Sequence, residues 1–234
     1  MATKEDILEQ IVEDYLIHKG YFVQHNLKFL PSSDHPDYVV SKDSNHSDID
    51  VIGFHPRLDG PEKVMVVSCK SWQRGFNPAA EIAAIDGNKK RRGSESWQSF
   101  RELTKQKWSE GFRRAIGNAT GCHSFTYVTA VTRLSGDRLL WEEHEPFRSA
   151  IGGNPIKILT LREMVEFVQV NLTTTPATTE IGRLLQLLAA ADMTPSSHPL
   201  RIAQRLAVES TKAMRQPTTR NGATRSALSE APKT

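Results

Sequence analysis

The chain has 234 residues, of which 38% are hydrophobic and 24% charged, enough for one compact domain with a full core and a smaller appendage. We see no charged-then-apolar leader and no apolar run long enough to span a bilayer, so we expect a soluble cytoplasmic protein with no membrane partner. Cys69 and Cys122 form no CxxC pair and have no histidine at metal-site spacing, which argues against a zinc site or a disulfide framework.

The formal net charge of +3 is unevenly distributed along the chain. From Pro195 onward there are seven Lys/Arg and two Asp/Glu, which leaves 23 basic and 25 acidic residues for the rest. The body is therefore not basic overall, and affinity for nucleic acid would have to come from local patches. The sharpest patch is the run Lys89, Lys90, Arg91 and Arg92, whose alternative interpretation is a solvated surface.

The first expected element is a helix over residues 3–20. A threonine cap and acids in the first turn favour its start, and Gly20 favours its end. Glu9 lies at the edge of the apolar stripe, whereas Glu13 lies further toward solvent. Glu9 is therefore the acid of this helix best placed to reach a sheet, the alternative being an exposed acid on an amphipathic helix.

Two apolar runs, Asp50–Phe54 and Val64–Cys69, are expected to form an antiparallel hairpin. Both are rich in β-branched residues, and residues 56–61 between them have the composition of a turn. In that register Asp50 lies across from the end that carries Lys70. Neither run alternates with polar residues, so we expect a sheet buried on both faces. The alternative is that Asp50 merely starts a strand and Lys70 extends into solvent at its end.

The rest of the chain alternates helices and strands, which favours an α/β fold: a mixed β-sheet flanked by helices, with a helical C-terminal appendage. The expected elements are a helix beginning at Asn77, a long amphipathic helix over 94–118, strands over 124–132 and 156–160, and helices over 161–170, 180–191 and 200–215.

The ordered set of the Glu9 helix, the Asp50 strand and the Ser68-Cys69-Lys70 strand resembles the PD-(D/E)XK nuclease superfamily. The resemblance covers roughly residues 5–135 and is nearest to the Mrr-like and Holliday-junction-resolvase-like branches. It implies a restriction-endonuclease-like fold and a metal-dependent DNA endonuclease that hydrolyses phosphodiester bonds, in restriction, defence or branched-DNA processing. It further implies that Asp50 is the metal-binding acid, Lys70 the catalytic lysine and Glu9 the first-helix acid.

One position departs from the superfamily pattern, because Ser68 stands where an acid or glutamine usually precedes the lysine by two residues. Some restriction enzymes of the superfamily also carry serine there and supply the acid from the next helix. Glu81 stands at about that distance here, although a first-turn acid is also favoured by the helix dipole. A Pro36-Asp37 pair lies in a polar loop far from the lysine in sequence, and Asp48, on the same strand face as Asp50, is the better substitute.

The chemistry that the resemblance implies suits these residue types. Phosphodiester hydrolysis needs a positioned water and stabilisation of negative charge, which Mg²⁺ supplies and for which Mn²⁺ should substitute. Asp50 and Glu81, with the backbone carbonyl of Cys69, would hold the ion, and Lys70 would orient the water. Glu9 could bind a second ion, and residues 89–92 would bind DNA phosphates.

The expected domains are a nuclease-like domain over 1–171, a linker and helical appendage over 172–215, and a disordered tail over 216–234. A homodimer is a further expectation, because cutting both strands of DNA often uses two symmetric active sites. The alternative function is a nuclease-like module that has lost catalysis and binds DNA or a protein. Ser68 is its main support.

Overall fold

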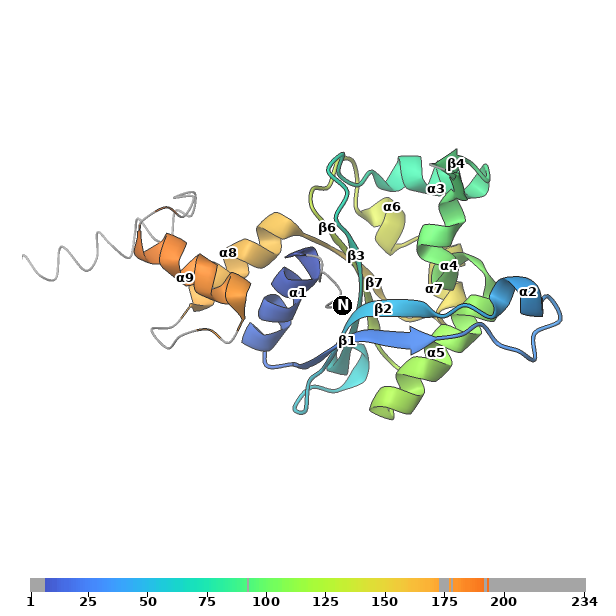
Figure 1. Cartoon of the computed structure of the whole chain (residues 1–234), viewed down its shortest axis with the longest axis horizontal. Helices are drawn as coiled ribbons and strands as arrows, with labels where there is room; N and C mark the ends of the chain where they lie inside the picture. Colours follow the sequence, from blue (N-terminus) through green and yellow to red (C-terminus); the bar gives the residue numbers. More distant parts are fainter. Residues whose placement is uncertain (1–6, 92, 173–176, 178, 192, 194–234) are drawn as a thin grey trace, which may run out of the picture. The chain divides into compact units, whose positions relative to one another are not determined.

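A computed structural model describes residues 7–91, 93–172, 177, 179–191 and 193 of the chain and places a five-stranded mixed sheet at the centre (Figure 1). Three antiparallel strands are followed by two parallel ones, which confirms the expected α/β class with a mixed sheet flanked by helices. In spatial order the strands are β1 (Phe22–Phe29), β2 (Ser47–Phe54), β3 (Val64–Lys70), β6 (Thr126–Val131) and β7 (Ile156–Thr160).

Helices cover both faces of this sheet (Figure 1). On one face lie α1 (Ile7–His18), α8 (Leu161–Asn171) and α9 (Glu180–Ala190). On the other lie α3 (Pro78–Asp86), α4 (Arg101–Thr104), α5 (Gln106–Thr120), α6 (Leu139–Glu142) and α7 (Glu145–Ala150). The connections contain α2 (Val40–Asp43), the 3-10 turns η1 (Gly60–Lys63) and η2 (Ser96–Phe100), and a small hairpin of β4 (Lys90–Arg91) and β5 (Ser94–Glu95).

The central strands are apolar on both sides because each side meets its own core. Val51, Met65 and Val67 pack in a cluster with α1, α8 and α9, whereas Val66 and Tyr127 pack in a second cluster with the helices of the other face. The absence of polar alternation in these strands correctly predicted a sheet buried on both faces.

The single helix expected over residues 94–118 is wrong. The segment is divided into η2, α4 and α5, because Lys105 has extended backbone angles (φ −127°, ψ 117°). At this break the Glu102 carbonyl oxygen accepts the Ser109 hydroxyl at 2.7 Å, whereas the Lys105 carbonyl oxygen accepts the backbone N–H groups of Trp108 and Ser109 at the start of α5. The break changes which side chains face the sheet.

The C-terminal helix α9 belongs to the same compact unit as the sheet, which runs to Asp192. Thr179 caps α9 and its Oγ1 donates to Oδ1 of the buried Asp14 on α1 at 2.5 Å. The helix expected over 200–215 and the tail expected from 216 lie outside the described residues. Across the ranges that are described, each helix is too short or too polar to cross a membrane.

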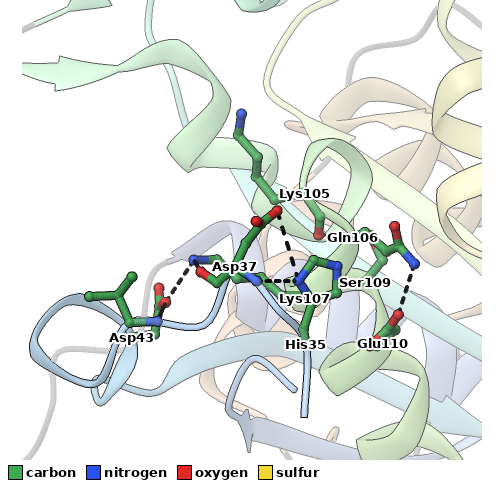
Figure 2. A network of polar contacts seen from close by, with 9 residues as sticks. His35, Asp37, Asp43, Lys105, Gln106, Lys107, Ser109 and Glu110 are labelled. Carbon is green, nitrogen blue, oxygen red and sulfur yellow. Dashed lines mark hydrogen bonds and ion pairs between the residues drawn. The ribbon is translucent and has the colours of Figure 1, made fainter. Parts of the chain in front are cut away.

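The connection between β1 and β2 is fastened to α5 (Figure 2). Lys107 Nζ donates to Asp43 Oδ2 at 2.6 Å and to the Asp37 carbonyl oxygen at 3.0 Å, and the Ser32 N–H donates to the Lys107 carbonyl oxygen at 2.8 Å. The Pro36-Asp37 pair is therefore part of this connection, where Asp37 offers a backbone oxygen to Lys107.

Lys107→Met is expected to lower the free energy of unfolding by about 2 kcal/mol at neutral pH, because it leaves the buried Asp43 carboxylate without its cation. Burial alone would raise the pKa of Asp43, but the hydrogen bonds from Lys107 and from the Val39 N–H hold this pKa below its ordinary 3.8. A lowered pKa stabilises the fold above the unfolded value and loses that effect as the pH falls through the folded value. The difference between variant and wild type should therefore shrink below pH 3.8.

Urea denaturation at several pH values measures this effect, with Lys28→Met, a change at an exposed lysine of β1, as the control. A Lys107→Met protein as stable as wild type at neutral pH would contradict the role given to this ion pair.

Candidate active site

Asp50 and Lys70 both lie just beyond the end of the β2–β3 ladder. Val51 is the last residue of β2 paired with β3 in this direction, opposite Val67, and one step beyond it the Asp50 carboxylate accepts the N–H of Cys69 (Oδ2 to N, 2.5 Å). The side chain of Asp50 thus accepts an N–H of β3 at the point where backbone pairing between β2 and β3 stops. It is held beside the residue that precedes Lys70, which is the placement that the hairpin register predicts.

Lys70 is fixed by two contacts on one face of β3. Its Nζ donates to Ser68 Oγ at 2.8 Å and lies 5.0 Å from the centre of the Phe100 ring. Residues 64–67 of β3 are buried, whereas Ser68, Cys69 and Lys70 are partly exposed, so the strand carries its polar groups to the edge of the core. The lysine side chain is therefore held in place at a partly exposed position.

Glu102 of α4 is a buried carboxyl group that the sequence analysis did not identify. Tyr127 of β6 donates its phenol proton to Glu102 Oε1 at 2.5 Å, and the two residues are 0% and 7% exposed. Burial raises the pKa of Glu102, the nearby charge of Lys70 and the Tyr127 hydrogen bond lower it, and the charge of Asp50 raises it; the net direction is upward. Glu102 therefore lies within electrostatic reach of both Lys70 and Asp50.

Polar side chains lead from Lys70 toward Glu102, and we call this set the relay. Ser68 accepts from Lys70 and lies near the Tyr127 hydroxyl, whose own proton goes to Glu102. Burial, and then the neighbouring Glu102, raise the pKa of Tyr127 well above 10.0, so the phenol keeps its proton and remains a donor. The relay runs from Lys70 through Ser68 and Tyr127 to Glu102.

No sequence signal marked Glu102. On a continuous helix, residue 102 lies about 200° around the axis from residue 100, so an apolar Phe100 predicts an exposed Glu102. In the structure Phe100 has non-helical angles (φ −144°, ψ 41°) and a new helix begins at Arg101. The change of phase allows both Phe100 and Glu102 to be buried.

The other predicted acids lie on different elements. Glu81 is in the first turn of α3, which Asn77 caps, and is 2% exposed; its Oε1 accepts from Arg74 Nη2 at 2.9 Å. Glu9 is partly buried on α1, which covers the sheet face opposite to that of Lys70. Asp48 is exposed and lies opposite Lys28 of β1. The catalytic roles of Glu81 and Glu9 stay predictions.

Basic residues lie near this end of the fold. Lys89 and Lys90 are exposed at the β4–β5 hairpin, and the Lys89 carbonyl oxygen accepts the N–H of Ser96, which begins η2. Arg91 completes β4, and Arg92 lies outside the described residues. Arg74, half exposed, stacks on Trp72 at 4.7 Å.

A Mg²⁺ site needs oxygen donors from the protein. Within the described residues, no group of three or more His, Cys, Asp or Glu side chains could hold a metal ion. Mg²⁺, however, usually keeps several waters and takes only one or two protein carboxylates. Asp50, partly exposed at the end of the β2–β3 ladder, offers one such carboxylate.

Comparisons with protein-family models, curated proteins and solved structures returned no significant match.

Proposed function

We propose that this protein is a Mg²⁺-dependent DNA endonuclease with a restriction-endonuclease-like fold. One observation carries the proposal: the Asp50 carboxylate accepts a hydrogen bond from the N–H of Cys69, so an acid is held beside the residue that precedes Lys70 at the end of β3. The mixed sheet flanked by helices supports it, because the superfamily that the chain resembles has this architecture. The sequence pattern and the local geometry thus favour the same chemistry.

Each side chain has a role in this proposal. Asp50 contributes a hard oxygen ligand, and the backbone carbonyl of Cys69 offers a second oxygen beside it. The Lys70 ammonium orients the attacking water and adds positive charge next to the scissile phosphate. A bound Mg²⁺ would supply Lewis-acid stabilisation of the developing negative charge.

DNA would be held by basic side chains around this end of the sheet. Lys89 and Lys90 are exposed, and Arg74 presents a guanidinium fixed by Trp72 and by the carboxylate of Glu81. Contacts of this kind with phosphates strengthen binding without reading sequence, and they weaken as salt rises.

The test is cleavage of supercoiled plasmid and of branched DNA in Mg²⁺, Mn²⁺ or EDTA, with an Asp50→Asn protein purified in parallel. Asparagine retains a side-chain oxygen that can accept the Cys69 N–H, so the fold should persist while the charge is lost. We expect metal-dependent cutting by wild type only. Equal cutting by both proteins would indicate a contaminating nuclease and contradict the proposal.

A second candidate, a module that binds DNA without cutting it, is favoured by the Ser68–Lys70 hydrogen bond. Ser68 stands two residues before the lysine, where the superfamily pattern has an acid, and its hydroxyl oxygen already accepts a hydrogen bond from the Lys70 ammonium. A gel-shift measurement on the same substrates separates the two functions. Equal binding by wild type and Asp50→Asn, with no cleavage in any metal, would support the binding module.

A further inference from the structure

Two basic side chains at α4 are each held over a tryptophan ring. Arg101 begins α4, and its Cζ lies 4.6 Å from the centre of the Trp108 ring. Lys105 directly follows α4, and its Nζ lies 4.9 Å from the centre of the Trp97 ring. Both basic residues are partly exposed. An aromatic face attracts a cation without neutralising its charge, so both side chains can still bind an anion.

The charges of these two side chains are not compensated by acids. In the part of the chain that the structure describes, neither Arg101 nor Lys105 forms an ion pair, whereas the nearby Lys107 is paired with Asp43. The acids closest in sequence accept hydrogen bonds from neutral groups instead: Glu95 from Trp97, Glu102 from Tyr127 and Glu110 from Gln106. The surface at α4 therefore carries two positive charges that an anionic partner can neutralise.

Packed aromatic rings connect the α4 cations to the candidate active site. Phe100, the residue before Arg101, packs edge-on against Trp72 with 6.0 Å between the ring centres. Lys70 lies over the Phe100 ring, and Arg74 lies over the Trp72 ring. The rings under all four cations belong to, or pack against, the same hydrophobic cluster on one face of the sheet. The four cations therefore lie on the same side of the sheet as the Lys70 ammonium.

The chemistry of this surface suits a nucleic-acid backbone. Duplex DNA carries one negative charge per about 1.7 Å of its axis, so a row of cations can engage several phosphates of one molecule. Trp108 is buried and the face of Trp97 is covered by Lys105, so neither ring is free to stack on a base. The surface thus offers charge to phosphates and no group that reads a base edge.

We propose that Arg101 and Lys105, together with Arg74, form a phosphate-binding surface that holds DNA of any sequence against Lys70. This inference rests on the proposed function, from which it takes DNA as the partner. It adds to that function a set of contacts on α4, and it makes the substrate class sequence-independent.

The test is DNA binding measured by fluorescence anisotropy of a labelled duplex, with the full chain in EDTA so that no cutting occurs. Salt is varied between about 50 and 200 mM KCl, because each phosphate contact contributes about 0.9 to the slope of log Kobs against log[KCl]. Lys105→Gln and Arg101→Gln should each reduce this slope by about 1 and weaken binding at the lowest salt by roughly 10-fold. Duplexes of unrelated sequence should show the same losses.

Two further variants separate charge from packing. Arg101→Lys keeps the positive charge, so it should retain the wild-type slope, and this comparison remains informative if Arg101→Gln fails to fold. Lys19→Gln is the matched control, since the exposed Lys19 also lies over an aromatic ring, that of Tyr15 at 5.2 Å, but on α1 at the other face of the sheet. It should bind DNA as wild type does.

Wild-type affinity and slope in both Arg101→Gln and Lys105→Gln would overturn this inference. Metal-dependent cleavage by wild type would in that case leave the nuclease function standing. A loss confined to one DNA sequence would contradict backbone binding, and cleavage by a wild type that shows no binding at the lowest salt would also overturn the surface. A wild type that neither binds nor cuts DNA would remove the proposed function and the inference with it.

Discussion

Lys70→Met is expected to slow DNA cleavage by about 10²- to 10³-fold, the range measured when one preorganised electrostatic group is removed from an active site. The ammonium group lies between Ser68 Oγ and the Phe100 ring, at the exposed end of β3. Methionine keeps an apolar stem over Phe100 and loses only the charge and its hydrogen bond. The loss should therefore appear in the cleavage rate and not in the folding transition.

Single-turnover cleavage of plasmid at saturating Mg²⁺ measures this effect, and Lys63→Met is a matched control. Lys63 Nζ also lies over a phenyl ring, that of Phe54 at 5.6 Å, but it precedes the opposite end of β3. This control should cut at the wild-type rate. A Lys70→Met protein that cuts as fast as wild type would exclude Lys70 from the chemistry.

Gly111→Ala is expected to be the most destabilising single methyl addition in α5, lowering the free energy of unfolding by about 2–4 kcal/mol. A Cβ at residue 111 would lie 1.8 Å from the Leu30 carbonyl oxygen, where the β1–β2 connection crosses the helix. Backbone cannot withdraw as a side-chain tip can, so the connection and α5 must separate. The better helix propensity of alanine, worth about 1 kcal/mol, offsets only part of this cost.

Gly117→Ala on the same helix is the comparison. Its Cβ would lie 3.0 Å from Cε1 of the His123 ring, a side chain that can move. We expect this variant to be close to wild type in urea denaturation, or slightly more stable. Equal stability of Gly111→Ala and Gly117→Ala would show that residues 30–31 do not pack on α5 as described.

Strand composition predicted much of the fold. The β-branched runs at the centre of the chain identified β2, β3 and β6, and the expected antiparallel hairpin placed Asp50 across from the end of β3 that carries Lys70. The failure over residues 94–118 has a physical cause. The apolar spacing on either side of Lys105 is compatible with one helix. The break is accompanied by a local hydrogen bond from the Ser109 hydroxyl to the Glu102 carbonyl oxygen, and no glycine or proline beside Lys105 marks it in the sequence.

The site was less predictable than the sheet, because its charges pair across elements. Asp50 and Lys70 lie on neighbouring strands, where local register is informative. Glu81 was chosen by spacing along the chain, and spacing does not reveal an Arg74 partner. The contact of Glu102 is with Tyr127, which follows it by 25 residues. Tyr127 is itself placed by the parallel pairing of β3 and β6, which the sequence near Glu102 does not reveal.

The two contacts that hold Lys70 have a consequence for substrate binding. A free lysine side chain carries about 2 kcal/mol of rotamer entropy, which is normally lost when the ammonium engages a phosphate. Here Ser68 and the Phe100 ring have already restricted that side chain during folding. A phosphate that binds at the end of β3 would therefore contact an ammonium group whose position is already fixed. The binding free energy of that phosphate would not be reduced by the entropy cost of ordering the lysine side chain.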